Sequence, residues 1–331
     1  MAKSDYHDEG PSLRAAVAEA SERIRPLVRA TPLEYSAPLS ELVGCHVFLK
    51  MENVQVTGSF KPRGAVNKLL CLRQEERQAG IVTASTGNHA LAVAYAAEKL
   101  GLQGTLFLTE NASPQKVAAL RRSSLSLRFF GHDCAVTEQE ARREASRTGA
   151  VYISPYNDLD VVAGQGTVAV ELEAELGRVD YLFAAVGGGG LIAGCAGYLK
   201  GGGQKTQVVG CLPANSPTMY ESIKAGRIVE VAVRPTLSDG TAGGIEPGAI
   251  TFPLCQRLVD DWVLVSEEEI RAALRQVFEE HRLVIEGAAG VAVAGALNFL
   301  RQTLPDRHAN AAIILCGGNI AIDRFKEVVC R

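Results

Sequence analysis

The sequence predicts an α/β protein with twisted, mostly parallel sheets flanked by helices, because short apolar runs alternate with longer amphipathic segments. The runs typical of strands are 45–52, 81–84, 104–108, 127–130, 151–153, 181–186, 207–212, 262–265 and 312–316. The segments with helical periodicity are 11–28, 62–78, 88–100, 114–123, 135–147, 160–177 and a short tail, 323–331. Strands that alternate with helices are joined by crossovers instead of hairpins, which makes neighbouring strands parallel.

Length and composition point to a two-domain globular protein. The chain has 331 residues, which suits two domains, and 47% of them are apolar, so large cores can be buried. The net charge is only −3 with both signs interspersed, which gives no electrostatic reason to expect nucleic acid or an anionic membrane as a partner. No apolar run reaches the ~18 residues that a membrane span needs. We expect small-molecule partners.

The cysteine pattern indicates a reducing compartment. Eight cysteines are scattered along the chain without a CxxC motif and without the Cys/His spacing of a zinc site. The N-terminal residues are polar and lack the apolar core of a signal peptide. We therefore expect a cytoplasmic protein with mostly buried thiols, among them Cys71, Cys195 and Cys255 in the core.

One lysine has an unusual setting, in the stretch TGSFKPRGA (57–65). Lys61 directly precedes Pro62, a residue that suits the first turn of a helix. A lysine buried at such a position loses hydration, so its pKa falls and its amine becomes nucleophilic. The ordinary alternative is a lysine that extends into solvent, and this stretch alone does not decide between the two.

A run of four glycines lies in VGGGGLIAG (186–194), between an apolar strand and an apparent helix. Such a run is costly inside a helix or a strand, but it lets backbone N–H groups converge on an anion at a helix N-terminus. The run also fits the dinucleotide pattern GxGxxA, yet no acidic residue ends a strand about 20 residues later. We therefore prefer a monophosphate site, with a flexible turn as the alternative.

Two further stretches place small polar residues after a strand. In ASTGNHA (84–90), hydroxyls and N–H groups at a helix start suit a carboxylate, although a plain helix cap explains them too. His89 in this stretch either binds a ligand or packs internally. In CGGNI (316–320), the thiol of Cys316 either hydrogen-bonds a ligand ring or is a buried structural cysteine.

Together and in this order, SFKPRGA, STGNHA, VGGGGLIAG and CGGNI resemble the fold-type II pyridoxal-phosphate enzymes, most closely the serine/threonine dehydratase (threonine ammonia-lyase) and serine racemase group. The resemblance extends from about residue 29 to 319. It implies a tryptophan-synthase-β-like fold with the cofactor, pyridoxal 5'-phosphate, in a cleft between two domains. Residues 1–53 and 158–331 would form the large cofactor-binding domain, and 54–157 a small mobile domain with the substrate-carboxylate loop. A homodimer is also implied.

The resemblance assigns roles to individual residues. Lys61 would bind the cofactor covalently and act as the catalytic base, with Phe60 on one face of the ring and Gly240 on the other. Asn88 would hydrogen-bond the ring's 3-oxygen. The phosphate would be held by Gly187, Gly188, Gly189, Gly190 and Leu191. The substrate carboxylate would be held by Ser85, Thr86, Asn88 and His89, with Thr86 also a candidate second acid/base.

Cys316 falls where many relatives have serine, opposite the pyridine nitrogen. A thiol is not an ionised acid at neutral pH, so it cannot keep that nitrogen protonated as an aspartate would. The cofactor is then a milder electron sink, which favours loss of a β-substituent over transamination. The implied activity is a lyase reaction by α,β-elimination, in which L-threonine or L-serine gives a 2-oxo acid and ammonia. Since no length remains for a C-terminal regulatory domain, a catabolic role is expected.

Alternatives and departures remain. Another pyridoxal-phosphate activity is the first alternative: serine or aspartate racemase, a dehydratase of 3-hydroxyaspartate or another hydroxy-amine, or a β-replacement synthase. Racemases have serine where this chain has Thr86. An inactive ligand-binding homologue is the second alternative. Leu212 stands where many relatives have a cation-binding Glu, so no metal is expected there. Glu286 is expected near the cofactor or as a helix cap, and Arg63 as a solvated partner of an acid.

Overall fold

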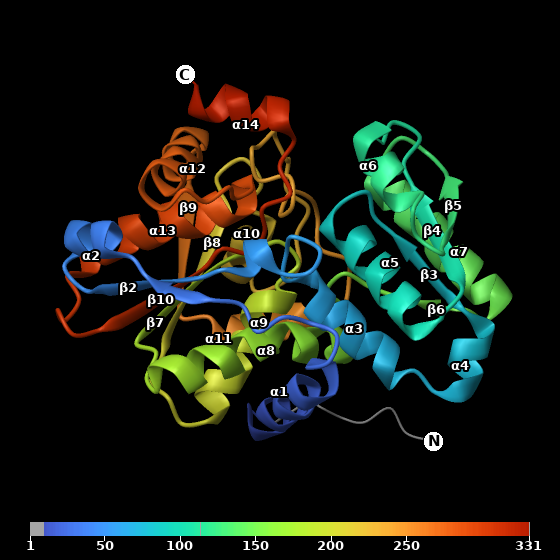
Figure 1. Cartoon of the computed structure of the whole chain (residues 1–331), viewed down its shortest axis with the longest axis horizontal. Helices are drawn as coiled ribbons and strands as arrows, with labels where there is room; N and C mark the ends of the chain where they lie inside the picture. Colours follow the sequence, from blue (N-terminus) through green and yellow to red (C-terminus); the bar gives the residue numbers. More distant parts are fainter. Residues whose placement is uncertain (1–9, 113, 331) are drawn as a thin grey trace.

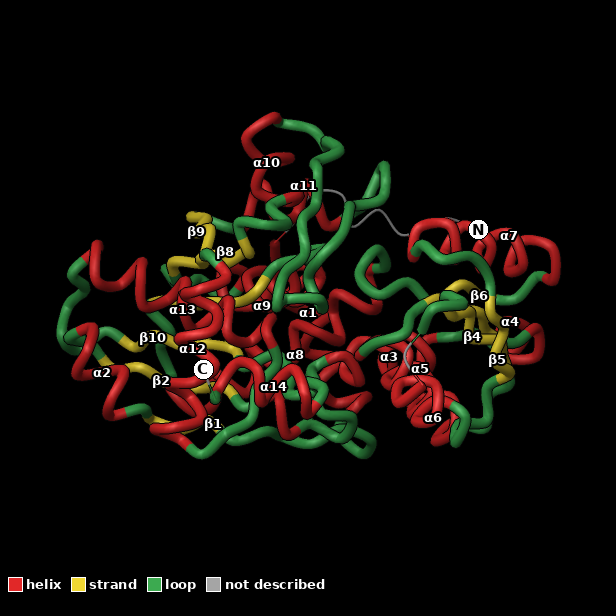
Figure 2. Tube along the Cα trace, turned by 90° about the horizontal axis from the view of Figure 1, so that it is seen from above, coloured by secondary structure: helices red, strands yellow, loops and turns green. Residues whose placement is uncertain are grey.

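The computed structural model describes residues 10–112 and 114–330, which are organised around two separate β-sheets (Figure 1). The six-stranded sheet has the order β1-β2-β10-β7-β8-β9, and the four-stranded sheet has the order β5-β4-β3-β6. In both views, the four-stranded sheet and helices α4 to α7 lie to one side of the six-stranded sheet (Figures 1 and 2).

The six-stranded sheet joins the two ends of the chain. Its strands are β1 (Leu33–Tyr35), β2 (His46–Lys50), β7 (Tyr181–Ala185), β8 (Gln207–Pro213), β9 (Asp261–Val265) and β10 (Asn310–Ile314). All neighbours are parallel except β1, which runs antiparallel to β2 at the edge. Asn310 pairs with His46 and Ile314 with Lys50, so an early strand and the last strand are neighbours.

The four-stranded sheet is entirely parallel. Its strands are β3 (Ile81–Ala84), β4 (Gly104–Leu108), β5 (Ser126–Phe129) and β6 (Val151–Tyr152). One face carries a core with α3 (Lys61–Cys71), α5 (Asn88–Leu100) and α6 (Pro114–Leu120). The other face packs against α7 (Cys134–Thr148) through Val82, Phe107 and Ala141.

Helices cover both faces of the six-stranded sheet (Figure 1). On one side lie α1 (Gly10–Ile24), α8 (Leu159–Leu176), α9 (Gly190–Gly201) and α11 (Thr251–Leu258). On the other lie α2 (Ala37–Val43), α12 (Glu267–His281), α13 (Gly287–Thr303) and α14 (Ile322–Val329), while α10 (Thr218–Ala225) contacts α11. Apolar residues of these helices and of the strands form one continuous core.

The predicted α/β class with parallel sheets is confirmed, and the predicted strands match the observed ones closely. One predicted helix, 62–78, is two helices, α3 and α4 (Gln74–Ala79). Leu72 is extended (φ −65°, ψ 133°) and buried, and the backbone N–H of Arg73 then donates to the Glu76 carboxylate, which starts a new helix. Residue 331, the last of the predicted tail, lies outside the described residues.

The thiols follow the prediction in part. Five of them are buried: Cys45, Cys195, Cys211, Cys255 and Cys316. The prediction that Cys71 lies in the core was wrong, because the residue is only half-buried near Lys68 and Asp160. Among the helices of the described chain, none is long and apolar enough to cross a bilayer.

Candidate active site

The four motifs converge between the two sheets, at the carboxyl ends of parallel strands. Asn88 begins α5 after β3, the glycine run follows β7, and Cys316 follows β10. The stretch that contains Lys61 joins them, because the Phe60 N–H donates to the Cys316 carbonyl at 3.0 Å and Ser59 forms a β-bridge with Gly317. Ligands of open α/β sheets bind at this edge, so one ligand there would lie beside all four motifs.

Lys61 is the first residue of α3 and points into the protein. Its Nζ donates to the Pro155 carbonyl at 3.0 Å and lies 5.1 Å from the centre of the Phe60 ring. Burial lowers the pKa of Lys61 from 10.5 to about 8, opposed by the nearby Cys316 and Glu286. The alternative of a lysine that extends into solvent therefore does not hold, and a nucleophilic amine is available near neutral pH.

The glycine run is closely packed and has no room for side chains. A Cβ on Gly188 would lie 2.3 Å from the Tyr156 ring, and one on Gly189 would lie 2.6 Å from Cys255 Sγ. Gly189 also has φ +85°, which favours glycine, and α9 begins at the next residue. The first N–H groups of this twelve-residue helix have no partner within the helix. This arrangement suits a phosphate.

The stretch after β3 forms a turn at the start of α5. The Gly87 N–H donates to Ser85 Oγ at 3.1 Å, and no side chain caps the helix. For the Thr86 hydroxyl, the described part of the chain offers no hydrogen-bond partner. The free N–H groups of the first turn and these hydroxyls together suit a carboxylate.

His89 packs internally. Its ring nitrogen Nε2 lies 3.0 Å from the Ile153 carbonyl, and the residue is buried. Burial lowers the pKa of His89 to about 3, so the ring is neutral and holds α5 against the neighbouring strand end. Of the two alternatives, the side chain takes the packing role. That the backbone N–H of His89 contributes to carboxylate binding stays a prediction.

Two polar side chains contact the Asn88 side chain. Its Nδ2 lies 2.9 Å from both carboxylate oxygens of Glu286, and its Oδ1 accepts from Asn319 Nδ2 at 2.8 Å. Glu286 is the N-cap residue of α13, as the helix-cap alternative predicted, but its side chain makes no capping hydrogen bond and contacts Asn88 instead. Burial raises the pKa of Glu286 to about 7. Asn319 was not singled out from the sequence, although it is the fourth residue of the CGGNI motif.

The remaining predicted residues lie around the same space. Gly240 faces the Glu286 carboxylate, because a Cβ on Gly240 would lie 3.4 Å from Glu286 Oε1. Cys316 is buried, and burial raises the pKa of its thiol well above the usual range, so the thiol stays protonated. Tyr156 was not predicted from any motif; its ring packs on Gly188 and its hydroxyl accepts the Glu246 N–H at 3.0 Å.

The expectations for two further residues, Arg63 and Leu212, had different outcomes. The expectation that Arg63 is solvated was wrong: its side chain is 1% exposed and pairs with Glu52 at 2.7 Å and with Glu171 at 2.7 Å. Leu212 is buried in β8, and its side chain offers no oxygen to a cation. That no metal binds there stays a prediction.

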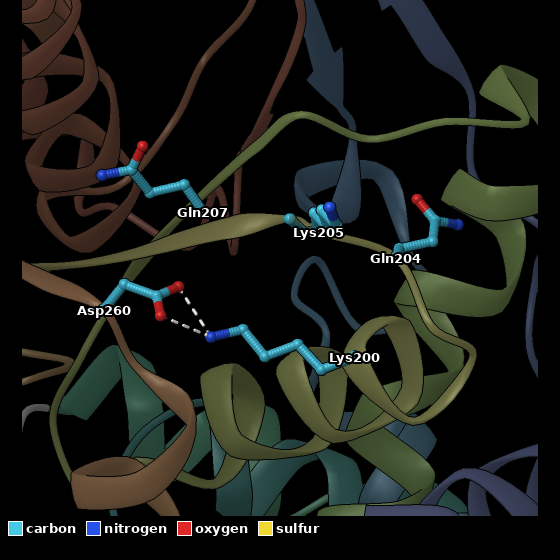
Figure 3. A pocket seen from close by; sticks show the side chains of 6 residues that line it. Lys200, Gln204, Lys205, Gln207 and Asp260 are labelled. Atoms are coloured by element: carbon cyan, nitrogen blue, oxygen red, sulfur yellow. Dashed lines mark hydrogen bonds and ion pairs between the residues drawn. The ribbon is translucent and has the colours of Figure 1, made fainter.

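A surface hollow elsewhere is separate from this site (Figure 3). It is lined by Lys200, Gln204, Lys205, Thr206, Gln207 and Asp260. Gln207 begins β8, so the hollow lies at the amino end of that strand, whereas the glycine run follows the carboxyl end of the parallel strand β7. Lys200 is already paired with Asp260 at 2.6 Å.

Comparison with known proteins adds independent findings. A family model described as "Pyridoxal-phosphate dependent enzyme" matches residues 24–317. An L-threonine ammonia-lyase of Thermotoga maritima is 39% identical over 95% of this chain and 77% of its own length. A catabolic L-threonine dehydratase of Staphylococcus aureus is 35% identical over 95% of this chain and 90% of its own.

Two solved structures also superpose on this chain over most of its length. The processed form of threonine deaminase isoform 2 from Solanum lycopersicum superposes with a TM-score of 0.91 at 31% identity, covering 97% of this chain and 93% of that one. Maize serine racemase superposes with a TM-score of 0.89 at 30% identity, covering 95% of both chains.

Proposed function

The chain belongs to the family of pyridoxal-phosphate dependent enzymes, and we propose that it works there as an ammonia-lyase that dehydrates and deaminates L-threonine or L-serine. The observation that carries this proposal is the inward-facing Lys61 amine with its lowered pKa, next to a glycine-lined helix start and an open hydroxyl-bearing turn. Curated relatives at 34–39% identity that are named threonine ammonia-lyases or threonine dehydratases support it.

The residues present fit pyridoxal phosphate. The Lys61 amine suits a covalent bond to an aldehyde, and the N–H groups after the glycine run suit the phosphate. Phe60 and Gly240 would flank the ring, Asn88 would contact its 3-oxygen, and Cys316 its nitrogen. When bound, the cofactor supplies an electron sink for the negative charge that develops at the substrate's Cα.

The chain's own residues would then perform the remaining tasks. Ser85, Thr86 and the first N–H groups of α5 would hold the substrate carboxylate and so orient the Cα–H bond. Lys61, whose pKa is about 8, would take the Cα proton as general base and return a proton to the leaving β-hydroxyl. The enamine released would hydrolyse to ammonia and 2-oxobutanoate from threonine, or pyruvate from serine.

Elimination is favoured by the partner of the ring nitrogen. The Cys316 thiol remains protonated, because burial raises its pKa well above the usual range. It offers no negative charge that would keep the ring nitrogen protonated, so the electron sink is mild. Departure of the β-hydroxyl then competes well with reprotonation at Cα.

The proposal also covers the domain organisation, the assembly and the cellular role of the enzyme. Residues 54–157 would form a small domain that closes over substrate, which the separate four-stranded sheet supports. The enzyme would be a cytoplasmic homodimer that needs no metal at Leu212, and its role would be catabolic. Phe60, Gly187, Gly188, Gly189, Gly190 and Leu191 would complete the cofactor site.

Racemisation is the second candidate, because one observation favours it. The Thr86 hydroxyl lies in the carboxylate turn, and serine and aspartate racemases are among the solved structures with this fold at about the same identity. A hydroxyl there could reprotonate Cα from the face opposite Lys61. The extra methyl of threonine crowds that position, so elimination remains the main proposal.

A spectrum combined with product analysis tests the proposal. The purified protein is loaded with pyridoxal phosphate, and its visible absorbance is recorded before and after addition of L-threonine, L-serine or L-threo-3-hydroxyaspartate. We expect a cofactor band and formation of 2-oxo acid and ammonia from at least one substrate. A band without oxo acid would overturn the lyase proposal, and chiral analysis of the amino acid would then test racemisation.

A further inference from the structure

The polar contacts of Asn88 form a chain of hydrogen bonds with a fixed direction. Asn319 Nδ2 donates to the Thr57 carbonyl and to Asn88 Oδ1, both at 2.8 Å. Asn88 Nδ2 then donates to the Glu286 carboxylate, 2.9 Å from either oxygen. Because a backbone carbonyl only accepts, Thr57 fixes which end of the Asn319 amide donates, and Asn319 in turn fixes the Asn88 amide.

The surrounding glycines leave the space that this cluster fills. A Cβ on Gly58 would lie 2.6 Å from Asn319 Oδ1, and one on Gly317 would lie 2.7 Å from a Glu286 oxygen. The Asn319 N–H also donates to Glu286 Oε2 at 3.3 Å. The side chains of Glu286 and Asn319 are therefore packed against glycine backbone, and the two residues also contact each other.

Asn88 retains a donor in this arrangement. The two oxygens of one carboxylate lie too close together to receive both N–H bonds of an amide, which diverge. One hydrogen of Asn88 Nδ2 is shared between the Glu286 oxygens, and the second is left for another acceptor. An amide turned over by 180° would instead place Nδ2 against the Asn319 donor and Oδ1 against the carboxylate.

We propose that Glu286 and Asn319 are positioning residues that hold the Asn88 amide with one N–H directed at the cofactor's ring oxygen. This inference rests on the proposed function for the identity of that acceptor. The cluster also joins the two sheets, because Asn88 begins α5 beside the four-stranded sheet, whereas Glu286 precedes α13 and Asn319 follows β10, both of which belong to the part built on the six-stranded sheet.

The charge on Glu286 decides how well it accepts. The titratable groups that face it are Asp239 from the loop before α11, Lys61 from α3 and Cys316 after β10. Burial is the main reason that the pKa of Glu286 is raised to about 7. As the pH falls through this value the carboxyl gains a proton, so it becomes a weaker acceptor for Asn88.

Cofactor binding to the cofactor-free protein tests the inference without relying on turnover. The dissociation constant of pyridoxal phosphate is measured by absorbance titration for Glu286→Gln, for Asn319→Ala and for the double variant. We expect each single variant to bind about tenfold more weakly, and the double variant about as weakly as the worse single one. The ratio of the Glu286→Gln constant to the wild-type constant should shrink from pH 8 to pH 6.

A matched pair elsewhere supplies the control. Glu269 accepts from Asn298 Nδ2 at 2.7 Å between α12 and α13, away from the site. Glu269→Gln should therefore leave cofactor binding and its pH dependence unchanged. Thermal unfolding of each cofactor-free variant identifies a folding defect, and Asn319→Ser is measured if Asn319→Ala does not fold.

The outcomes separate this inference from the proposed function. Wild-type binding by both single variants, additive effects in the double variant, or a pH-independent ratio would each overturn the positioning role. A wild-type protein that binds cofactor but forms no 2-oxo acid would overturn the lyase proposal only, since the positioning test reads binding.

Discussion

Two inward-facing lysines of this protein have opposite surroundings. Lys50 is 0% exposed, and its Nζ lies 2.6 Å from the Thr31 carbonyl, 2.7 Å from Glu171 and 3.3 Å from Glu175. Lys61 donates to one backbone carbonyl, and among the residues that the structure describes no carboxylate lies within ion-pair distance of its Nζ. Burial without a neutralising carboxylate is what lowers the pKa of Lys61 and makes its amine reactive.

The two environments are adjacent along one helix. Arg63 lies two residues after Lys61 on α3, yet it belongs to the ion network of Lys50, because both bind Glu171 at 2.7 Å. Glu52, which is 0% exposed, pairs with Arg63 from the other side. The network thus fixes the start of the helix that carries the reactive amine, while leaving that amine unpaired.

Replacing Lys61 with alanine should have the largest effect. The covalent cofactor band should disappear, and kcat/KM should fall by at least about a thousandfold, because the same amine binds the cofactor and moves the proton. Lys61→Arg keeps the positive charge and should be equally inactive. Turnover at the wild-type rate in either variant, measured by 2-oxo-acid formation, would contradict the assignment.

Replacing Lys50 with methionine should instead affect stability. It removes the buried ammonium from Glu171, which keeps Arg63, and from the half-exposed Glu175, and loss of such charge-assisted hydrogen bonds costs about 1.5–3 kcal/mol of the free energy of unfolding. Urea unfolding measures this. Lys200→Met, which breaks the more exposed pair with Asp260, is the control and should cost no more than about 1 kcal/mol. If both variants lost the same free energy of unfolding, the buried network of Lys50 would contribute no more to stability than an exposed ion pair.

The titration of Lys61 should be visible in the cofactor-free protein. Its pKa is lowered from 10.5 to about 8, so the rate of covalent cofactor attachment should rise with pH with a midpoint near 8. Because the folded pKa is below the unfolded one, this group also makes the free energy of unfolding rise between about pH 8 and 10.5. A midpoint near 10.5 would mean that Lys61 is as well solvated as a surface lysine.

The smallest effect is expected at Cys316. Replacement by serine exchanges one neutral donor for another, since burial keeps the thiol protonated. The value of kcat/KM should change by no more than about threefold, and the ratio of elimination to racemisation should stay the same. A change of reaction, measured by chiral product analysis, would show that the thiol does more than remain neutral.

Local patterns predicted much of this molecule, and long-range contacts account for what they missed. The strands and the placement of Lys61, Asn88 and the glycine run follow from apolar runs and from glycine chemistry, which are local. The burial of Arg63 depends on Glu171, which is more than a hundred residues away in the chain. Asn319 likewise acquires its role only when β10 places it opposite Asn88.

The helix expected at 62–78 shows the limit of periodicity, because the pattern continues across Leu72 while the backbone does not. Leu72 at this break is extended and packs into the core, and such packing depends on distant contacts that short-range sequence patterns do not determine.

Chemical reduction of the cofactor-loaded protein tests the central claim most directly. Borohydride fixes the cofactor on the amine that holds it, and peptide mass spectrometry then identifies that residue. The account predicts modification of the peptide that contains Lys61 and none on the peptide that contains Lys50. Modification of Lys50, or spread over surface lysines with Lys61 unmodified, would contradict it.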